Sequence, residues 1–165
     1  NFALEAKNCG LKFFEQPIPS KDLDFMNIIT TKSSVPICSD EGVHSKKDID
    51  DIINNRTSNG VSLKTIKLGG IVDVLNCAIF ANENNISVNL AGKVAETSIS
   101  SYAIANIATS IPQMKWDLSI TNQYLVEDPV LEPLNIKDGK VHIKETIGLG
   151  TEIDMSKAKK YIIQN

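Results

Sequence analysis

Short apolar runs alternate with helical segments along the whole sequence, at a spacing of about 25 residues. The runs that are typical of strands are residues 11–14, 35–39, 61–68, 86–90 and 114–118. Between them, apolar residues recur with helical period in 22–32, 46–56, 70–84 and 95–109. Strand alternating with helix predicts parallel βα units. A unit of this length with little insertion favours a (β/α) barrel over an open sheet.

The number of predicted strands limits how much of a barrel the chain can form. An eight-stranded barrel needs about 250 residues, whereas these 165 residues supply about five strands. The predicted fold class is therefore α/β, an incomplete barrel that corresponds to the back half of a TIM-type barrel. We expect βα repeats over 1–134 and a C-terminal tail over 135–165. Because the chain opens at Asn1 in a helical-looking stretch, we expect its beginning to lie elsewhere.

Charge and cysteine content exclude several classes of protein. The net charge is −3 and the basic residues are dispersed, so we expect no nucleic-acid surface. Cys9, Cys38 and Cys77 lie far apart without a CxxC spacing, which predicts reduced, buried thiols in a cytoplasmic protein. No apolar run approaches membrane-spanning length and none is typical of a signal peptide, so we expect no membrane partner.

Polar residues recur where the predicted strands end, 24 to 28 residues apart. They are Glu15, Asp40, Lys64, Asn89 and Asp117. Repeated units place equivalent positions on the same rim, and barrel enzymes build their active sites at the carboxyl ends of the strands. We therefore expect Glu15, Asp40 and Lys64 to point into one pocket.

Two carboxylates with a lysine beside them suggest a particular chemistry. Carboxylate oxygens suit Mg²⁺, or Mn²⁺ as an alternative, because these hard cations prefer oxygen ligands. A lysine in a desolvated pocket beside a divalent cation can act as a base. The alternative is that Glu15 and Asp40 are strand-end caps and that Lys64 is a solvated charge. Because all three residues recur at the same position of the repeat, the metal and base site is favoured over this alternative.

Three motifs at these positions resemble a known family. "FFEQPIP", "PICSDEG" and "LKTIKLGGI" are similar, in order and spacing, to the C-terminal barrel half of the enolase superfamily, in particular its muconate-lactonizing-enzyme subgroup with the mandelate-racemase relatives. The resemblance continues through "DPVLEPLNIKDGKVHI" and "GLGTEID" and so covers nearly the whole chain. It implies that the chain holds about strands four to eight of the barrel, without the N-terminal capping domain and the first strands.

The resemblance also implies roles for individual residues. Glu15 and Asp40 match Mg²⁺ ligands at the ends of the fourth and fifth strands, and Lys64 matches the acid/base lysine at the end of the sixth. Glu41, next to Asp40, matches a residue that supports the ligands. Lys67 is interpreted as a structural residue or a charge on the rim.

Substrate contacts are expected from the later strands. Asp117 occupies the eighth-strand position at which family members place substrate-determining side chains, and Asn89 is assigned to substrate binding with it. Dipeptide epimerases carry an Asp-x-Asp pair at this position, but here Ser119 replaces the second acid, which disfavours a dipeptide. Glu96 is a candidate supporting residue of the site, or alternatively an acid favoured at the start of a helix.

The function implied by the resemblance is abstraction of the proton α to a carboxylate, with Mg²⁺ stabilising the enediolate. Racemisation or epimerisation, dehydration and cycloisomerisation all begin in this way. The third metal ligand and a Lys-x-Lys base are expected on strands that this chain lacks, so the isolated chain is expected to be inactive. The alternative is a non-catalytic half-barrel that binds a ligand or assembles with a partner chain.

Open strand edges predict association. A half-barrel leaves parallel strands exposed at 11–14 and near 114–118, and such edges invite pairing. We expect the edge beside 11–14 to be covered by a second copy of the chain or by the tail at 138–145. The expected partners are thus a small carboxylate substrate and a further copy of this chain.

Overall fold

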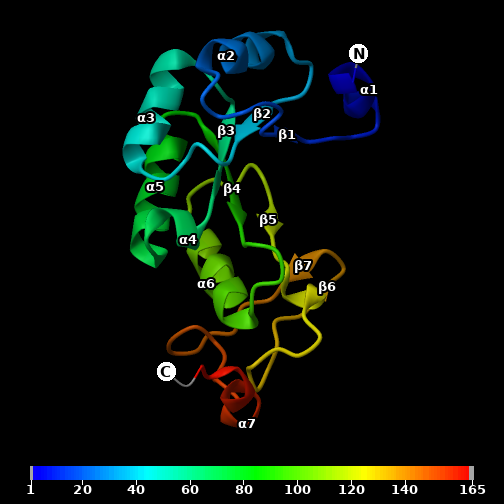
Figure 1. The fold of residues 1–165 in the computed structure, drawn as a ribbon, viewed down its shortest axis with the longest axis vertical. Coiled ribbons are helices and arrows are strands. Elements are labelled where there is room, and N and C mark those ends of the chain that lie inside the picture. Colours follow the sequence, from blue (N-terminus) through cyan, green and yellow to red (C-terminus); the bar gives the residue numbers. More distant parts are fainter. Residues whose placement is uncertain (1, 164–165) are drawn as a thin grey trace. The chain divides into compact units, whose positions relative to one another are not determined.

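The computed structural model describes residues 2–163 and divides into two compact units (Figure 1). The first unit comprises residues 1–90 and 111–117, and the second comprises 91–110 and 118–165. Elements of the first unit are α1 (Phe2–Asn8), β1 (Phe14–Glu15), α2 (Leu23–Lys32), β2 (Ile37–Ser39), α3 (Lys46–Asn55), β3 (Gly60–Leu63), α4 (Thr65–Leu68), α5 (Ile71–Glu83) and β4 (Ser87–Ala91), whose last residue belongs to the second. Elements of the second are α6 (Ser98–Thr109), β5 (Leu118–Ser119), η1 (Asn122–Tyr124), β6 (Ile136–Lys137), β7 (Lys140–Val141), α7 (Met155–Ala158) and η2 (Lys159–Tyr161).

The sheet has the strand order of the sequence, β1 to β5. Strands β1 to β4 pair in parallel, with Glu15 opposite Cys38, Ser39 opposite Val61 and Ser62 opposite Asn89. Each pair of strands is joined through a helix, so the predicted βα repeat is confirmed. The α/β half-barrel follows because consecutive parallel strands need crossover helices on their outer face.

The helices lie where the sequence predicts them, but three strands do not. The strand expected over 11–14 is wrong, because β1 begins only at Phe14. Residues 61–68 were expected to form one strand, yet β3 ends at Leu63 and 65–68 form the short helix α4. That helix ends at Leu68 and is capped by Gly69, whose φ of +101° favours glycine. The strand expected over 114–118 is also wrong, because β5 begins only at Leu118. Before it, Trp116 is buried and stacks on Phe13, with ring centroids 4.3 Å apart.

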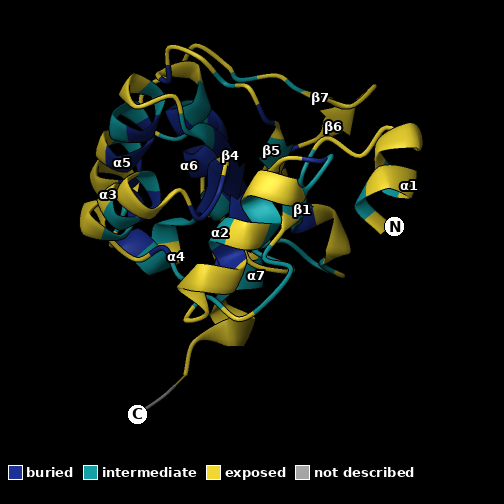
Figure 2. Cartoon of the chain, turned by 90° about the horizontal axis from the view of Figure 1, so that it is seen from above, coloured by how far each residue is buried: buried dark blue, intermediate teal, exposed yellow. Residues whose placement is uncertain are grey.

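Buried apolar residues cover the strands and the helix faces packed on them. In the first unit Ile37, Val61, Leu63 and Val88 on the strands are at most 1% exposed. Figure 2 colours β4 almost entirely as buried. Helix α3 buries Ile49 and Ile52, as its periodicity predicts.

The three cysteines differ in burial. Cys38 and Cys77 are buried free thiols, as predicted, whereas Cys9 is free and exposed. The prediction for Cys9 is wrong because this residue follows α1, a helix without buried residues. Among the described helices, none is long and apolar enough to cross a membrane.

The C-terminal tail contains a β-hairpin that the sequence analysis missed. Strands β6 and β7 pair antiparallel, with Ile136 opposite Val141. Asp138 and Gly139 between them both have positive φ, +52° and +70°. An Asp-Gly pair with this geometry is typical of a two-residue hairpin turn, so the dipeptide was the available signal.

Candidate active site

Asp40 is buried and is the centre of a partly buried charged cluster at the carboxyl end of β2. Lys64 Nζ donates a hydrogen bond to Asp40 Oδ2 and Lys67 Nζ donates one to Oδ1, each at 2.6 Å. The backbone N–H of Asp40 donates to Gln16 Oε1 at 2.8 Å. We call Asp40, Lys64 and Lys67 the Asp40 cluster. Each carboxylate oxygen of Asp40 thus has its own ammonium partner.

The two lysines reach Asp40 from one turn of helix. Lys64 follows β3 directly and is the N-cap residue of α4, and Lys67 lies three positions later within α4. Residues three apart lie on the same side of a helix, so both ammonium groups face the same way. Of the three residues expected to share one pocket, Asp40 and Lys64 are in direct contact.

Lys67 is a member of the cluster that the sequence analysis described only as a structural residue or a charge on the rim. Its Nζ donates to Asp40 Oδ1, to the carbonyl oxygen of Asp40 at 2.5 Å and to that of Ser62 at 3.1 Å. Its side chain is only 13% exposed, so it is no solvated rim charge. The signal that could have found it is its spacing of three from Lys64.

Burial and hydrogen bonding oppose each other in the electrostatics of the cluster. Burial alone would raise the pKa of Asp40, but hydrogen bonds from Lys64 and Lys67 outweigh it and hold that pKa below its ordinary value. Burial lowers the pKa of Lys67, although its contact with Asp40 acts in the opposite direction. Asp40 is therefore held in its charged form.

Glu15 lies at the end of the strand next to that of Asp40. It is exposed, and it pairs in the sheet with Cys38. Burial raises the pKa of the Cys38 thiol, and the negative charges of Glu15 and Asp40 raise it further. Because β1 and β2 are parallel and Asp40 directly follows β2, Glu15 and Asp40 lie at the same end of the sheet.

The donor chemistry of Glu15 and Asp40 fits a hard divalent cation. Two carboxylates from neighbouring strands, with further oxygens from substrate or water, are a usual donor set for Mg²⁺. Within residues 2–163, no group of three or more His, Cys, Asp or Glu side chains is arranged to hold a metal. The described chain thus brings two carboxylates to neighbouring strand ends.

Asn89 and Asp117 lie together, and each has a polar partner within the protein. Asn89 is buried in β4, where its side chain accepts from Ser62 Oγ at 3.2 Å and donates to the carbonyl oxygen of Asp117. Asp117 precedes β5 rather than ending it, and its exposed side chain forms an ion pair with Lys12. Glu41 is also exposed, beside Asp40.

Glu96 belongs to the second unit. It precedes α6, and its carboxylate accepts a hydrogen bond from Ser100 Oγ in the first turn of that helix. This contact favours the interpretation as an acid at a helix start. The carboxylate of Asp128 plays a similar part, because it accepts from the backbone N–H and the hydroxyl of Ser98.

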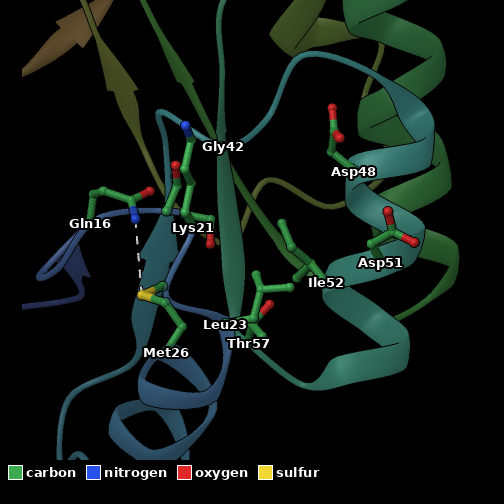
Figure 3. A pocket seen from close by; sticks show the side chains of 11 residues that line it. Gln16, Lys21, Leu23, Met26, Gly42, Asp48, Asp51, Ile52 and Thr57 are labelled. Atoms are coloured by element: carbon green, nitrogen blue, oxygen red, sulfur yellow. Dashed lines mark hydrogen bonds between the residues drawn. The ribbon is translucent and has the colours of Figure 1, made fainter.

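A cavity of about 380 Å³ in the first unit lies next to Asp40, because its wall includes Ser39 and Gln16 (Figure 3). It is lined by Gln16, Ser20, Lys21, Leu23, Met26, Ser39, Gly42, Asp48, Asp51, Ile52 and Thr57. Its acids already have partners, since Asp48 accepts from Ser45 Oγ and Asp51 from Lys47 Nζ. The carboxylates on the wall of this cavity are thus bound within or next to α3.

A parallel βα half-barrel with acids and lysines at the carboxyl ends of its strands defines the class of barrel enzymes to which the chain is related. Within that class, residues 1–157 match the family described as "Enolase C-terminal domain-like", and the chain belongs to this family. The resemblance seen in the sequence motifs is confirmed. Members of the superfamily typically use a divalent metal.

Known proteins similar to this chain are enzymes of the same superfamily. A chloromuconate cycloisomerase of Cupriavidus necator is 25% identical over 156 residues, which are 94% of this chain and 42% of that protein. An o-succinylbenzoate synthase of Listeria innocua is 26% identical over 95% of this chain and 42% of its own length. The structure of the muconate lactonizing enzyme of Pseudomonas putida matches with a TM-score of 0.89 at 26% identity, over 96% of this chain and 44% of that one. The chain spans less than half the length of these relatives.

Proposed function

We propose that the protein to which this chain belongs abstracts the proton α to a carboxylate of a small substrate, in an Mg²⁺-dependent reaction through an enediolate. The observation that carries the proposal is the Asp40 cluster, with Lys64 Nζ 2.6 Å from Asp40 Oδ2 and with Glu15 at the end of the neighbouring strand. Family membership supports it, because the similar proteins include cycloisomerases and a synthase.

Glu15 and Asp40 are the residues of this chain that would hold the cation. When bound, the cation supplies Lewis-acid stabilisation of the charge that develops on the substrate carboxylate. Asp40 is suited to this role because its lysine partners keep it ionised. Glu15 is suited because its exposed carboxylate is open to a ligand.

Lys64 is the proposed base. Within the described residues its Nζ has a single hydrogen-bond acceptor, Asp40 Oδ2, and its side chain is 21% exposed. Lys67, in contrast, donates to three acceptor atoms and is 13% exposed. As a neutral amine, Lys64 would take the α-proton on its lone pair and become an ammonium, and with a single contact to Asp40 the rest of its nitrogen is open to a substrate. All three N–H groups of the Lys67 ammonium are already used.

The remaining candidates are proposed to act on specificity. Asn89 and Asp117 are kept as substrate-binding residues and Glu41 as a residue that supports the site, whereas Glu96, expected to support it, is assigned to the start of α6. Racemisation or epimerisation, dehydration and cycloisomerisation share the proposed first step. They differ in what the enediolate does next.

Exchange of substrate α-protons tests the proposal. The full-length protein with Mg²⁺ is incubated in heavy water with a panel of small carboxylic acids that carry an α-proton, and deuterium uptake is followed by NMR. We expect exchange with at least one acid, and we expect Lys64→Ala to slow it by roughly 10²–10⁴-fold, the usual contribution of a positioned general base.

Lys47→Ala is the matched control, because Lys47 pairs with Asp51 on the exposed face of α3. It should exchange at the rate of the unaltered protein. Unchanged exchange in Lys64→Ala would remove Lys64 from the mechanism. Absence of exchange with every acid and with Mg²⁺ present would favour the alternative, a non-catalytic half-barrel that binds a ligand or a partner chain.

A further inference from the structure

Lys67 holds Asp40 at two points. Its Nζ donates one hydrogen bond to Asp40 Oδ1 at 2.6 Å and another to the backbone carbonyl oxygen of Asp40 at 2.5 Å. A third hydrogen bond, to the carbonyl oxygen of Ser62 at 3.1 Å, ties the ammonium to β3. With three donors on three acceptors, the hydrogen-bonding capacity of the ammonium is used completely.

The double contact restricts how the Asp40 side chain can turn. Rotation of the carboxylate about its terminal bond would move Oδ1 away from an ammonium that the two carbonyl oxygens keep in place. Gln16 Oε1 holds the other side of the same residue by accepting from its backbone N–H. Asp40 is therefore fixed at its N–H, its carbonyl and Oδ1, and Oδ2 is the oxygen that faces Lys64.

We propose that Lys67 is a positioning residue for the active site: it fixes the orientation of the Asp40 carboxylate so that this ligand is preorganised for a divalent cation. The inference rests on the proposed function, since it gives Asp40 the role of a metal ligand. Lys67 and Lys64 then have different tasks despite binding the same carboxylate. Lys64 transfers the substrate proton, whereas Lys67 contacts only protein atoms and affects the site by orienting Asp40.

Calorimetric titration of the full-length protein with Mn²⁺ alone tests this role without any turnover. Residues that orient a metal ligand from behind typically contribute 10–100-fold to metal affinity. We expect Lys67→Met, which keeps most of the side-chain volume and loses the donors, to bind Mn²⁺ roughly 10–100-fold more weakly. Lys64→Met should bind Mn²⁺ no more weakly than the unaltered protein, because it removes a positive charge without releasing Oδ1.

Two further variants control for charge and for folding. Lys47→Met removes a lysine from an exposed pair with Asp51 and should leave the affinity unchanged. Lys67→Arg keeps the positive charge, but a planar guanidinium cannot direct three donors from one nitrogen onto the three acceptors. We expect at least a roughly 10-fold loss of affinity in Lys67→Arg, which keeps the inference testable even where Lys67→Met does not fold.

Three results would overturn the inference. The first is Mn²⁺ binding by folded Lys67→Met, or by Lys67→Arg, that is as tight as in the unaltered protein. The second is an equal loss in Lys64→Met, which would mean that any ammonium beside Asp40 suffices. Both leave the proposed function standing. The third is no Mn²⁺ binding by the unaltered protein, which would overturn the metal-dependent function and the role of Lys67 together.

Discussion

Asp40 and Asp117 occupy equivalent places in the repeat of the sequence, but the structure gives them opposite surroundings. Asp40 is 7% exposed and shares its two carboxylate oxygens between Lys64 and Lys67. The side chain of Asp117 is 74% exposed and pairs with Lys12, itself 64% exposed. Both belong to the same compact unit. Spacing along the chain therefore does not decide whether a strand-end carboxylate becomes part of a site.

The physical difference between the two aspartates is how far each carboxylate is exposed to water. Charges in a region of low dielectric interact strongly, and losing one partner of a buried pair leaves the other uncompensated. Exposed pairs are screened by water and contribute about 0–1 kcal/mol. Substitutions in the two regions should accordingly differ several-fold in their effect on stability.

Asp40→Asn is expected to have the largest effect. It leaves the ammonium groups of Lys64 and Lys67 without their anionic partner in a mostly buried place, so the free energy of unfolding should fall by about 3 kcal/mol. Urea denaturation of the full-length protein measures the change. A loss below about 1 kcal/mol would show that the Asp40 cluster behaves like a surface pair.

Gly60→Ala tests what holds the chain beside Asp117 in place. A Cβ at residue 60 would lie 2.2 Å from the Trp116 ring and 2.6 Å from the carbonyl oxygen of Ser87. Such overpacking typically costs about 1–3 kcal/mol, to be measured by urea denaturation. Adding Trp116→Leu should make the two substitutions non-additive, because both change one contact. Strict additivity would contradict this packing.

Asp48 is intermediate in burial between Asp40 and Asp117. It is partly buried near the start of α3 and accepts from the backbone N–H of His44 and from Ser45 Oγ, both at 2.9 Å. Burial would raise the pKa of Asp48, but these hydrogen bonds lower it below its ordinary value. We expect Asp48→Asn to lower the free energy of unfolding by about 1 kcal/mol at pH 7.

The pH dependence of this effect has a definite sign. A carboxyl group with a lowered pKa in the folded state contributes stability above its unfolded pKa of about 3.9, and the contribution is lost as pH falls through the folded value. The difference between the unaltered protein and Asp48→Asn should therefore shrink in acid. Unfolding curves at neutral and acidic pH measure it, and a difference that grows in acid would contradict the assignment.

Asp117→Asn is expected to have the smallest effect, within about 0.5 kcal/mol, because it removes one half of an exposed pair. Lys12→Met, which removes the other half, should match it. Denaturation of both variants beside Asp40→Asn completes the series. A loss at Asp117 comparable to that at Asp40 would abolish the distinction between the two regions.

The sequence alone determined the repeat and the family. Apolar periodicity depends only on neighbours along the chain, so the helices over 22–32 and 46–56 could be placed to within about one residue. The same repeat brought Asp40 and Lys64 into one group, because parallel strands end at the same edge of a sheet. The motifs around these residues are sufficient to indicate the enolase superfamily, to which the chain belongs.

Tertiary structure decided how deeply each of these residues is buried. Burial depends on segments that are distant in the sequence, such as Trp116 stacking on Phe13 while its neighbour Asp117 faces solvent. Lys67 joined the Asp40 cluster for the same reason: the turn of α4 directs its ammonium to carbonyl groups of two different strand ends. Periodicity specifies the face on which a side chain lies, but only packing specifies the solvent around it and therefore the strength of its charge interactions.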